Sequence, residues 1–230
     1  MTVEIRRSTD RFVDRESGRM TRHAFSFGQH YRPDWASFGP MVCHDDHLLG
    51  AGKGFTDHPH SGLEIVTTVL SGSLEHRDST GTARTLAAGG VAVLSAGVGV
   101  SHAELAPASG SARFVQVWLT PDDGGTEPAY AAAEVDAAEG AGLVPVVGGG
   151  GPLDIGVAGA SYAVARLAAG ETLALPAAPR LHVYLASGAL LRSSLAEPLH
   201  DGDAFLMTGE PSYEVTAAVP THLLVWTFDR

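Results

Sequence analysis

The chain has almost no cysteine, since Cys43 is the single thiol among 230 residues. One cysteine excludes an intramolecular disulfide and any zinc site built from several thiolates. The N-terminal sequence MTVEIRRSTDRFVDRE lacks the apolar core of a secretory signal. The longest uncharged run, TLAAGGVAVLSAGVGVSH, has too few large apolar residues to form a membrane-spanning helix. These absences predict a reduced protein of the cytoplasm.

Positive charge is also scarce. Fifteen Lys and Arg stand against 26 Asp and Glu, which gives a formal net charge of −11 at pH 7. A surface of this sign exerts no long-range attraction on phosphate backbones or anionic lipid. We therefore expect neither a nucleic acid nor a membrane as partner. With 44% hydrophobic residues, the chain can nevertheless bury a sizeable core.

Short apolar stretches punctuated by 28 glycines and 13 prolines run through the sequence. LEIVTTVL, GVAVLS, ARFVQVWLT, LHVYLAS and THLLVWTF are rich in β-branched or aromatic residues and are separated by turn signals. This pattern predicts an all-β fold of the sandwich or barrel type. The one helix that we expect is the Ala-rich EPAYAAAEVDAAEG near residues 127–140, as a short connector between two halves.

The two halves resemble each other. VLSGSL at 69–74, AAGGVAVLS at 87–95 and VQVWLT at 115–120 are echoed by LASGAL at 185–190, HDGDAFLMT at 200–208 and LLVWTF at 223–228. The alignment pairs Gly72 with Gly188, Gly89 with Gly202 and Trp118 with Trp226. A supersecondary unit that occurs twice predicts a duplicated β-barrel.

Two pairs of candidate ligands stand out among the 11 histidines. DHPHSGLE contains His58 and His60, and SHAEL contains His102 and Glu104. Residues i and i+2 of a strand point to the same face, so two strands of a closed barrel can direct both pairs to one point. Four ordinary polar residues in loops are the alternative interpretation.

Three imidazoles and one carboxylate suit a divalent first-row metal and leave coordination positions open. Iron, nickel, manganese, copper and zinc all tolerate this donor set. If Gly188 is aligned with Gly72, the positions that correspond to His58 and His60 are Ala174 and Pro176. The sequence therefore places any metal site in the first half.

Other polar residues are weaker candidates. Glu64 is interpreted as a structural residue or as one that orients a ligand. His76 and Asp78, in EHRDS, could reach the mouth of a site, but a charged hairpin edge is favoured. CHDDHL at 43–48 is expected in a surface loop, because adjacent residues of an extended chain diverge. Solvated or capping roles are expected for His182 and His200.

On these motifs the chain resembles the cupins and, more specifically, the pirin family. Gly52 followed by five residues and His58-Pro-His60 is the beginning of the cupin signature. HPHSGLEIVTTVLSGSLEHRDSTG, LSAGVGVSHAE and HAFSFGQHYRPDWASFG resemble pirin sequences. The resemblance covers nearly the whole chain and is strongest between residues 23 and 120. It implies a bicupin of two tandem jelly-roll-type barrels, with the metal site in residues 1–135 and a degenerate barrel without ligands in 136–230.

The resemblance also implies a function. In pirins the ligands correspond to His58, His60, His102 and Glu104, and the expected metal is Fe(II). Pirin-like proteins of this type are associated with quercetin 2,3-dioxygenase activity, in which dioxygen opens a flavonol with loss of carbon monoxide. Glu104 would then also act as the general base. One alternative is a non-catalytic regulator that senses the redox state of iron and binds a protein partner. Another is a metal site that merely stabilises the barrel. A monomer is expected, because two fused barrels already bury each other's faces.

Overall fold

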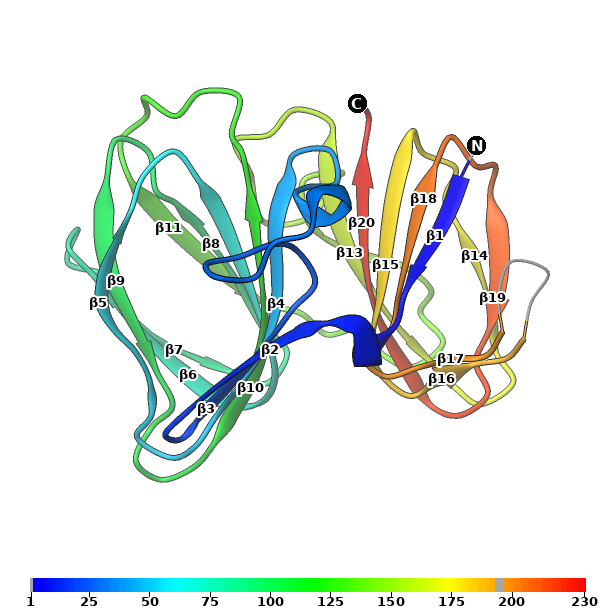
Figure 1. Cartoon of the computed structure of the whole chain (residues 1–230), viewed down its shortest axis with the longest axis horizontal. Helices are drawn as coiled ribbons and strands as arrows, with labels where there is room; N and C mark the ends of the chain where they lie inside the picture. Colours follow the sequence, from blue (N-terminus) through cyan, green and yellow to red (C-terminus); the bar gives the residue numbers. More distant parts are fainter. Residues whose placement is uncertain (1, 193–196) are drawn as a thin grey trace. The chain divides into compact units, whose positions relative to one another are not determined.

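A computed structural model describes residues 2–192 and 197–230. These residues form two compact units. The N-terminal barrel consists of residues 12–135 with 155–157, and the C-terminal barrel of the chain up to Arg11, residues 136–154 and everything from Ala158 onward. Strands dominate both units (Figure 1), which confirms the all-β prediction. The described chain contains no helix with the length and apolar character needed to cross a membrane.

The N-terminal barrel is built around a sheet in the order β11-β8-β6-β10-β4-β3-β2. Strands β7 and β9 also pair with β6, and β5 pairs with β9. Figure 1 shows β5 and β9 on the side of this unit opposite β4 and β10. The long strand β6 pairs with four neighbours and so links the two sides. The strands are β2 Phe12–Glu16, β3 Arg19–His23, β4 Met41–Leu49, β5 Gly54–His60, β6 Glu64–Asp78, β7 Ala83–Ala87, β8 Gly90–Ser95, β9 Val100–Leu105, β10 Ala112–Leu119 and β11 Ala129–Glu134.

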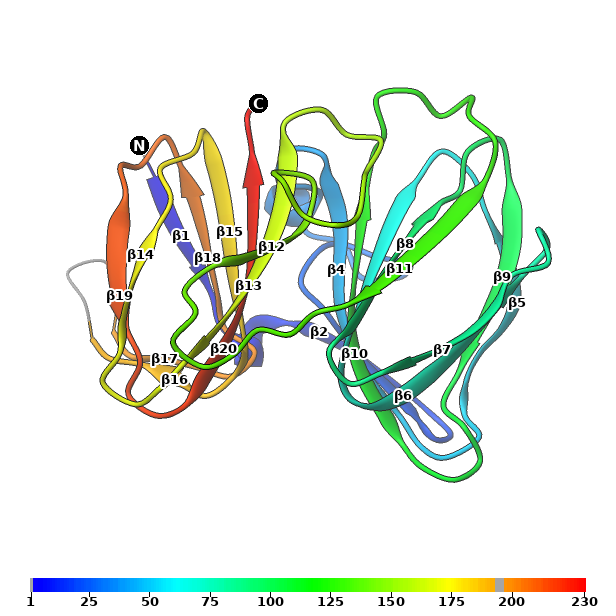
Figure 2. The ribbon, with the colours of Figure 1, turned by 180° about the vertical axis from the view of Figure 1, so that it is seen from behind.

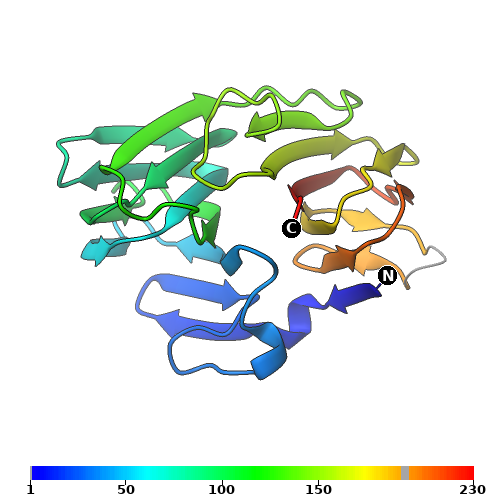
Figure 3. The same cartoon turned by 90° about the horizontal axis from the view of Figure 1, so that it is seen from above.

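The C-terminal barrel contains a sheet in the order β1-β18-β15-β20-β13-β12 and the separate pairs β14–β19 and β16–β17. The first strand, β1, lies beside β18 (Figure 3), so the start of the chain belongs to this barrel. The sequence had instead placed all of residues 1–135 in the first barrel. The strands are β1 Thr2–Arg6, β12 Val144–Val147, β13 Ala160–Leu167, β14 Thr172–Leu175, β15 Arg180–Ser187, β16 Ala189–Leu190, β17 Leu199–His200, β18 Ala204–Thr208, β19 Tyr213–Thr216 and β20 Thr221–Phe228.

The expected helix at 127–140 is wrong. Residues 129–134 form β11, which pairs antiparallel with β8 over its whole length (Figure 2). The high helix propensity of Ala and Glu is a weak preference that pairing with a buried neighbouring strand overrides. The helical elements of the described residues are two 3-10 turns, Ser8–Asp10 and Pro33–Trp35.

The internal repeat is confirmed at Gly72 and Gly188, which have the same backbone conformation in the two barrels. Gly72 and Gly188 have positive φ angles of 70° and 90°. A Cβ atom would lie 1.9 Å from the carbonyl oxygen of Ser111 at the first position and 2.5 Å from that of Pro220 at the second. Only glycine fits so close to the start of the next paired strand.

The tryptophans are not equivalent, although the sequence pairs them. Ala112 is opposite Gly72 in the β10–β6 register, and Trp118 comes six positions after it. Trp118 lines the interior of its barrel. Trp226 stands between Val225 and Thr227 in β20, one position out of step with the inward-facing Leu223 and Val225. It stacks on Tyr162 at a ring-centroid distance of 4.8 Å. Because side chains alternate between the faces of a strand, a shift of one residue reverses the face.

The two barrel interiors differ in polarity. Apolar side chains such as Val183, Phe205 and Val225 fill the C-terminal barrel. In the N-terminal barrel, two apolar clusters lie at different levels of the strands, one around Val69 and Phe114 and another around Ile65. The inward-facing residues between these levels are Thr67 on β6 and Gln116 on β10, both buried. The first barrel therefore has a polar centre, whereas the described inward-facing residues of the second barrel's core are apolar.

Candidate metal centre

The two ligand pairs predicted from sequence lie on paired neighbouring strands. His58 and His60 are on β5, and His102 and Glu104 on β9. In the antiparallel register, His58 is directly opposite His102, beside a bulge between Phe55 and His58. Pro59 is tolerated between the histidines because β5 is an edge strand that pairs only with β9. Cross-strand pairing and the i, i+2 spacing together bring the side chains to one point.

The imidazoles of His58, His60 and His102 form a tight group. Their candidate ligand atoms lie within 4.8 Å of one another, and their ring centroids are separated by 4.5 to 5.0 Å. Nε2 of His60 and both ring nitrogens of His102 are buried and have no hydrogen-bond partner among the described residues. Nδ1 of His58 donates to the carbonyl oxygen of Thr56 at 2.7 Å, which leaves its Nε2 as the nitrogen with a free lone pair. Buried nitrogens without partners are costly unless a metal uses them, so this group fits a metal ion.

Burial keeps the rings of His60 and His102 neutral. It lowers the pKa of His60 to about 4 and that of His102 to about 3, and the neighbouring His58 reinforces both shifts. A neutral imidazole is the form that coordinates a metal. The ligand atoms are therefore available at neutral pH without the release of a proton.

Glu104 is held by a chain of hydrogen bonds. The Nε2 atom of Gln116 donates to Oε2 of Glu104 at 2.7 Å, and the indole N–H of Trp118 donates to Oε1 of Gln116 at 2.8 Å. Thr67 Oγ1 donates to Oε1 of Glu104 at 3.3 Å. Burial raises the pKa of Glu104 to about 7, although both of its donors lower it.

Replacing Gln116 tests this chain of hydrogen bonds. The Gln116→Leu variant should bind a divalent metal about tenfold more weakly, because Glu104 loses the donor that orients its carboxylate. Competition with a chromophoric chelator measures the dissociation constant. Trp118→Phe removes only the outer donor and should change the affinity by less than about threefold. An unchanged affinity in Gln116→Leu would show that the hydrogen bond from Gln116 does not orient Glu104 for the metal.

Glu104 shares a second group with His102 and with a residue that the sequence had placed elsewhere. Candidate ligand atoms of His76, His102 and Glu104 lie within 4.8 Å of one another. His76 is opposite Glu104 in the β6–β9 register and is buried, and its Nε2 lies 2.9 Å from Oδ2 of Asp78. The favoured interpretation of His76 and Asp78 as a charged hairpin edge is correct for the hairpin, which β6 forms with β7, but wrong for the edge. This part of β6 also pairs with β9, so it has a neighbouring strand on both sides.

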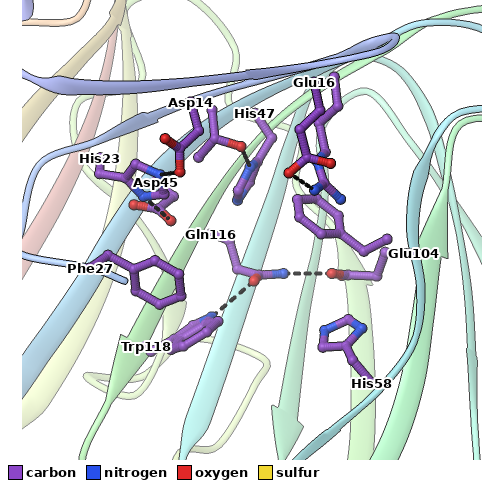
Figure 4. Close-up of a pocket in the computed structure, with 13 residues that line it drawn as sticks. Asp14, Glu16, His23, Phe27, Asp45, His47, His58, Glu104, Gln116 and Trp118 are labelled. Carbon is purple, nitrogen blue, oxygen red and sulfur yellow. Dashed lines mark hydrogen bonds and ion pairs between the residues drawn. The ribbon is translucent and has the colours of Figure 1, made fainter. Parts of the chain in front are cut away.

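A cavity of about 220 Å³ opens beside the candidate ligands. Figure 4 shows Glu104 and His58 at one side of it, Phe27, Gln116 and Trp118 along it, and His23, Asp45 and His47 at another side. The pair His23–Asp45 is joined by a 2.8 Å contact, and Nε2 of His23 lies 3.2 Å from Oδ2 of Asp14. Burial alone would lower the pKa of His23, but the two carboxylates more than offset this and raise it.

The segment CHDDHL is not a surface loop. It lies in the buried strand β4, where Asp45 and His47 face the cavity. The adjacent Asp46 is also buried and forms an ion pair with Arg113, at 2.8 Å between Oδ2 and Nη2. The prediction that these residues diverge holds, but the burial of the strand was missed.

Three further expectations have clear outcomes. Glu64 is buried, accepts a hydrogen bond from Ser95 Oγ at 2.8 Å and belongs to neither group of candidate ligands. His182 is completely buried, which contradicts a solvated or capping role, whereas His200 is exposed. Ala174, which corresponds to His58, lies in β14, and Pro176, which corresponds to His60, lies just after this strand. The pair of β14 with β19 contains no histidine.

The cavity residues that sequence reasoning did not assign to the site include Phe27, His47, Gln116 and Trp118. The alternation Phe114, Gln116, Trp118 on β10 was the available signal. A glutamine among inward-facing apolar residues needs a polar partner inside the barrel. The partner, Glu104, could not be identified without the strand order.

Known proteins resemble the chain over its full length. The family model described as Pirin matches residues 5–119. A protein of Mycobacterium tuberculosis (strain H37Rv) named "Putative quercetin 2,3-dioxygenase Rv0181c" is 39% identical over 98% of this chain and 94% of its own. The Quercetin 2,3-dioxygenase of Escherichia coli K12 is 38% identical over 53% of each chain.

Solved structures agree with the fold. YhhW from Escherichia coli superimposes with a TM-score of 0.91 at 25% identity, covering 99% of this chain and 97% of that one. The bacterial pirin YhhW in complex with nickel(II) gives a TM-score of 0.89 at 24% identity over 99% of each chain. The match to the family model and the full-length similarity lead to one conclusion: the chain belongs to the pirin family.

Proposed function

We propose that this protein is a metal-dependent dioxygenase that opens quercetin-type flavonols or related enediol and catechol compounds. His58, His60, His102 and Glu104 would hold one divalent metal, with Fe(II) as the expected ion. Nickel, manganese, copper and zinc suit the same donors. Glu104 would also exchange a proton with the substrate.

One observation carries the proposal. Three imidazoles converge within 4.8 Å, two of them with buried nitrogens that lack a partner among the described residues, beside a cavity with aromatic walls. A metal that only stabilised the barrel would need no cavity. The names of the mycobacterial and Escherichia coli relatives, and the nickel(II) complex of a bacterial pirin, support the same reading.

When bound, the metal would supply Lewis acidity toward a substrate hydroxyl and the site of reaction with dioxygen. The chain supplies the remaining functions. Phe27, Phe55 and Trp118 give the cavity aromatic walls, which favour a planar ring and exclude water. Glu104, with a pKa near 7 in the metal-free protein, is suited to accept the proton of a substrate hydroxyl at its Oε atoms. Gln116 fixes the direction of that carboxylate.

The test uses protein purified without added metal, analysed for bound metals and reloaded with Fe(II) under anaerobic conditions. Air-saturated buffer then starts the reaction, and flavonol absorbance, oxygen uptake and carbon monoxide release are followed together. Wild type should consume quercetin with uptake of one dioxygen and release of one carbon monoxide. His58→Ala and Glu104→Ala should each lower the rate by about a hundredfold or more.

A second result would favour another function. If wild type binds iron through these residues but turns over no flavonol, the dioxygenase proposal is wrong. The alternative of an iron-dependent redox regulator would then be tested by comparing protein partners of the Fe(II) and Fe(III) forms. Equal turnover by wild type and both variants would instead contradict the assignment of the site.

A further inference from the structure

The cavity beside the candidate metal centre has a second hydrogen-bonding residue, His47, that the proposed chemistry does not use. His47 is on β4, across the barrel from the strands that carry the candidate ligands (Figure 1). Its side chain points into the cavity between the His23–Asp45 pair and Glu104 (Figure 4). It belongs to neither group of candidate metal ligands.

The ring of His47 is fixed in orientation. Nδ1 lies 2.9 Å from Oγ1 of the buried Thr21. The imidazole also packs against Phe114 and Phe55, at ring-centroid distances of 4.7 and 5.0 Å. These contacts leave Nε2 as the nitrogen for the cavity, and the described residues provide no hydrogen-bond partner for it. A buried group of this kind normally serves a ligand or water.

The protonation state suits a hydroxyl partner. Burial lowers the pKa of His47 to about 4, and the nearby Asp45 and Asp46 only partly oppose this shift. The neutral ring has one N–H and one lone pair. The contact with Thr21 uses one of the two at Nδ1, and the other is at Nε2, where a hydroxyl group can pair with either.

The spacing fits one planar molecule. The ring centroid of Phe55 lies 5.0 Å from that of His47 and 6.2 Å from that of His58, so the two imidazoles are at most about 11 Å apart. Phe55 also has the guanidinium of Arg19 4.1 Å above its ring, which fixes this aromatic wall. A molecule of two or three aromatic rings can therefore contact both ends of the cavity.

We propose that Nε2 of His47 forms a hydrogen bond with a second hydroxyl of the substrate, distant from the hydroxyl at the metal. The proposal rests on the proposed function and narrows it. The preferred substrates are polyhydroxylated planar aromatics, and those with a single metal-binding hydroxyl are poor. His47 is thus a specificity-determining residue.

The test compares two flavonols that share the 3-hydroxyl and 4-carbonyl. Quercetin carries further hydroxyls, and 3-hydroxyflavone carries none. Dissociation constants are measured by quenching of tryptophan fluorescence, with protein loaded with Ni²⁺ under anaerobic conditions so that no turnover occurs. Wild type should bind quercetin more tightly. His47→Phe, which keeps an aromatic ring against Phe55 and Phe114, should weaken quercetin about tenfold and 3-hydroxyflavone less than twofold.

Two further variants separate recognition from packing. His47→Gln places an amide near the position of Nε2 and should restore quercetin binding to within about threefold of wild type. His200→Phe changes an exposed histidine of the C-terminal barrel and should change neither affinity. Circular dichroism and thermal unfolding establish that each variant is folded.

The outcomes distinguish the two proposals. If wild type binds neither flavonol, the proposed function fails, and the role of His47 with it. If wild type binds both, but with equal affinity, only the role of His47 is wrong. Equal weakening of both ligands in His47→Phe, or no weakening of either, overturns it as well. A selective loss for quercetin with rescue by glutamine supports it.

Discussion

The His102→Ala variant should bind a divalent metal at least about a hundredfold more weakly than wild type, with a matching loss of flavonol oxidation. His102 is the residue common to both groups of candidate ligands, and its side chain is 1% exposed. Neither of its ring nitrogens has a partner among the described residues. Removal of this ring should therefore break both groups at once. Isothermal titration with Ni²⁺ and metal analysis after dialysis measure the loss.

The metal-free protein should respond differently. Removing a buried ring with two unpartnered nitrogens relieves a desolvation cost that roughly offsets the lost packing. The free energy of unfolding in the presence of a chelator should therefore change by about 1 kcal/mol or less. His200→Ala, at the exposed position of β17, serves as the matched histidine control and should leave metal binding unchanged. Global unfolding of His102→Ala without metal would show that the ring is a core residue and not primarily a ligand.

Glu104→Gln should have opposite effects on stability with and without metal. In the metal-free folded protein, burial raises the pKa of Glu104 from 4.5 to about 7. The unfolded chain therefore releases this proton at lower pH than the folded chain. The folded state binds more protons between these values, so the contribution of Glu104 to stability falls as the pH rises from about 4.5 to 7.

Glutamine does not titrate and escapes this penalty. Metal-free Glu104→Gln should be more stable than wild type at pH 8 by about 1–3 kcal/mol, and this advantage should shrink toward pH 5. Urea unfolding in the presence of a chelator, measured across this pH range, gives the difference. A stability difference that does not depend on pH would contradict the raised pKa.

With metal present the order should reverse. A ligand at a thousand times its dissociation constant stabilises the folded state by about 4.1 kcal/mol, and the variant that lacks the carboxylate loses most of this. Glu64→Gln is the matched control, because Glu64 is an equally buried glutamate of the same barrel, with Ser95 Oγ as its donor. It should leave the metal-induced stabilisation unchanged. A loss of that stabilisation in Glu64→Gln would place the metal elsewhere.

Much of the fold followed from the sequence because it depends on local patterns. Short β-branched runs between glycines specified strands, and Gly72 and Gly188 marked the repeat because only glycine tolerates a positive φ so close to another backbone. The i, i+2 spacing of His58 with His60 and of His102 with Glu104 fixed which side chains share a strand face. The absence of histidines at the matching positions of the second half followed from the same repeat.

The tertiary structure alone decided which residues meet. Pairing of β9 with both β5 and β6 brings His76 to Glu104, whereas the sequence suggested an exposed edge. Burial of β4 turns Asp45 and His47 into walls of the cavity, although their polar composition indicated a loop. Pairing with β8 makes a strand of an Ala-rich segment with helical propensity. The sequence by itself determined the strands, the repeat and the spacing of the candidate ligands, since these depend on residues close together in the chain. Strand order and burial depend on contacts between distant segments, and only these decided how the cavity is lined.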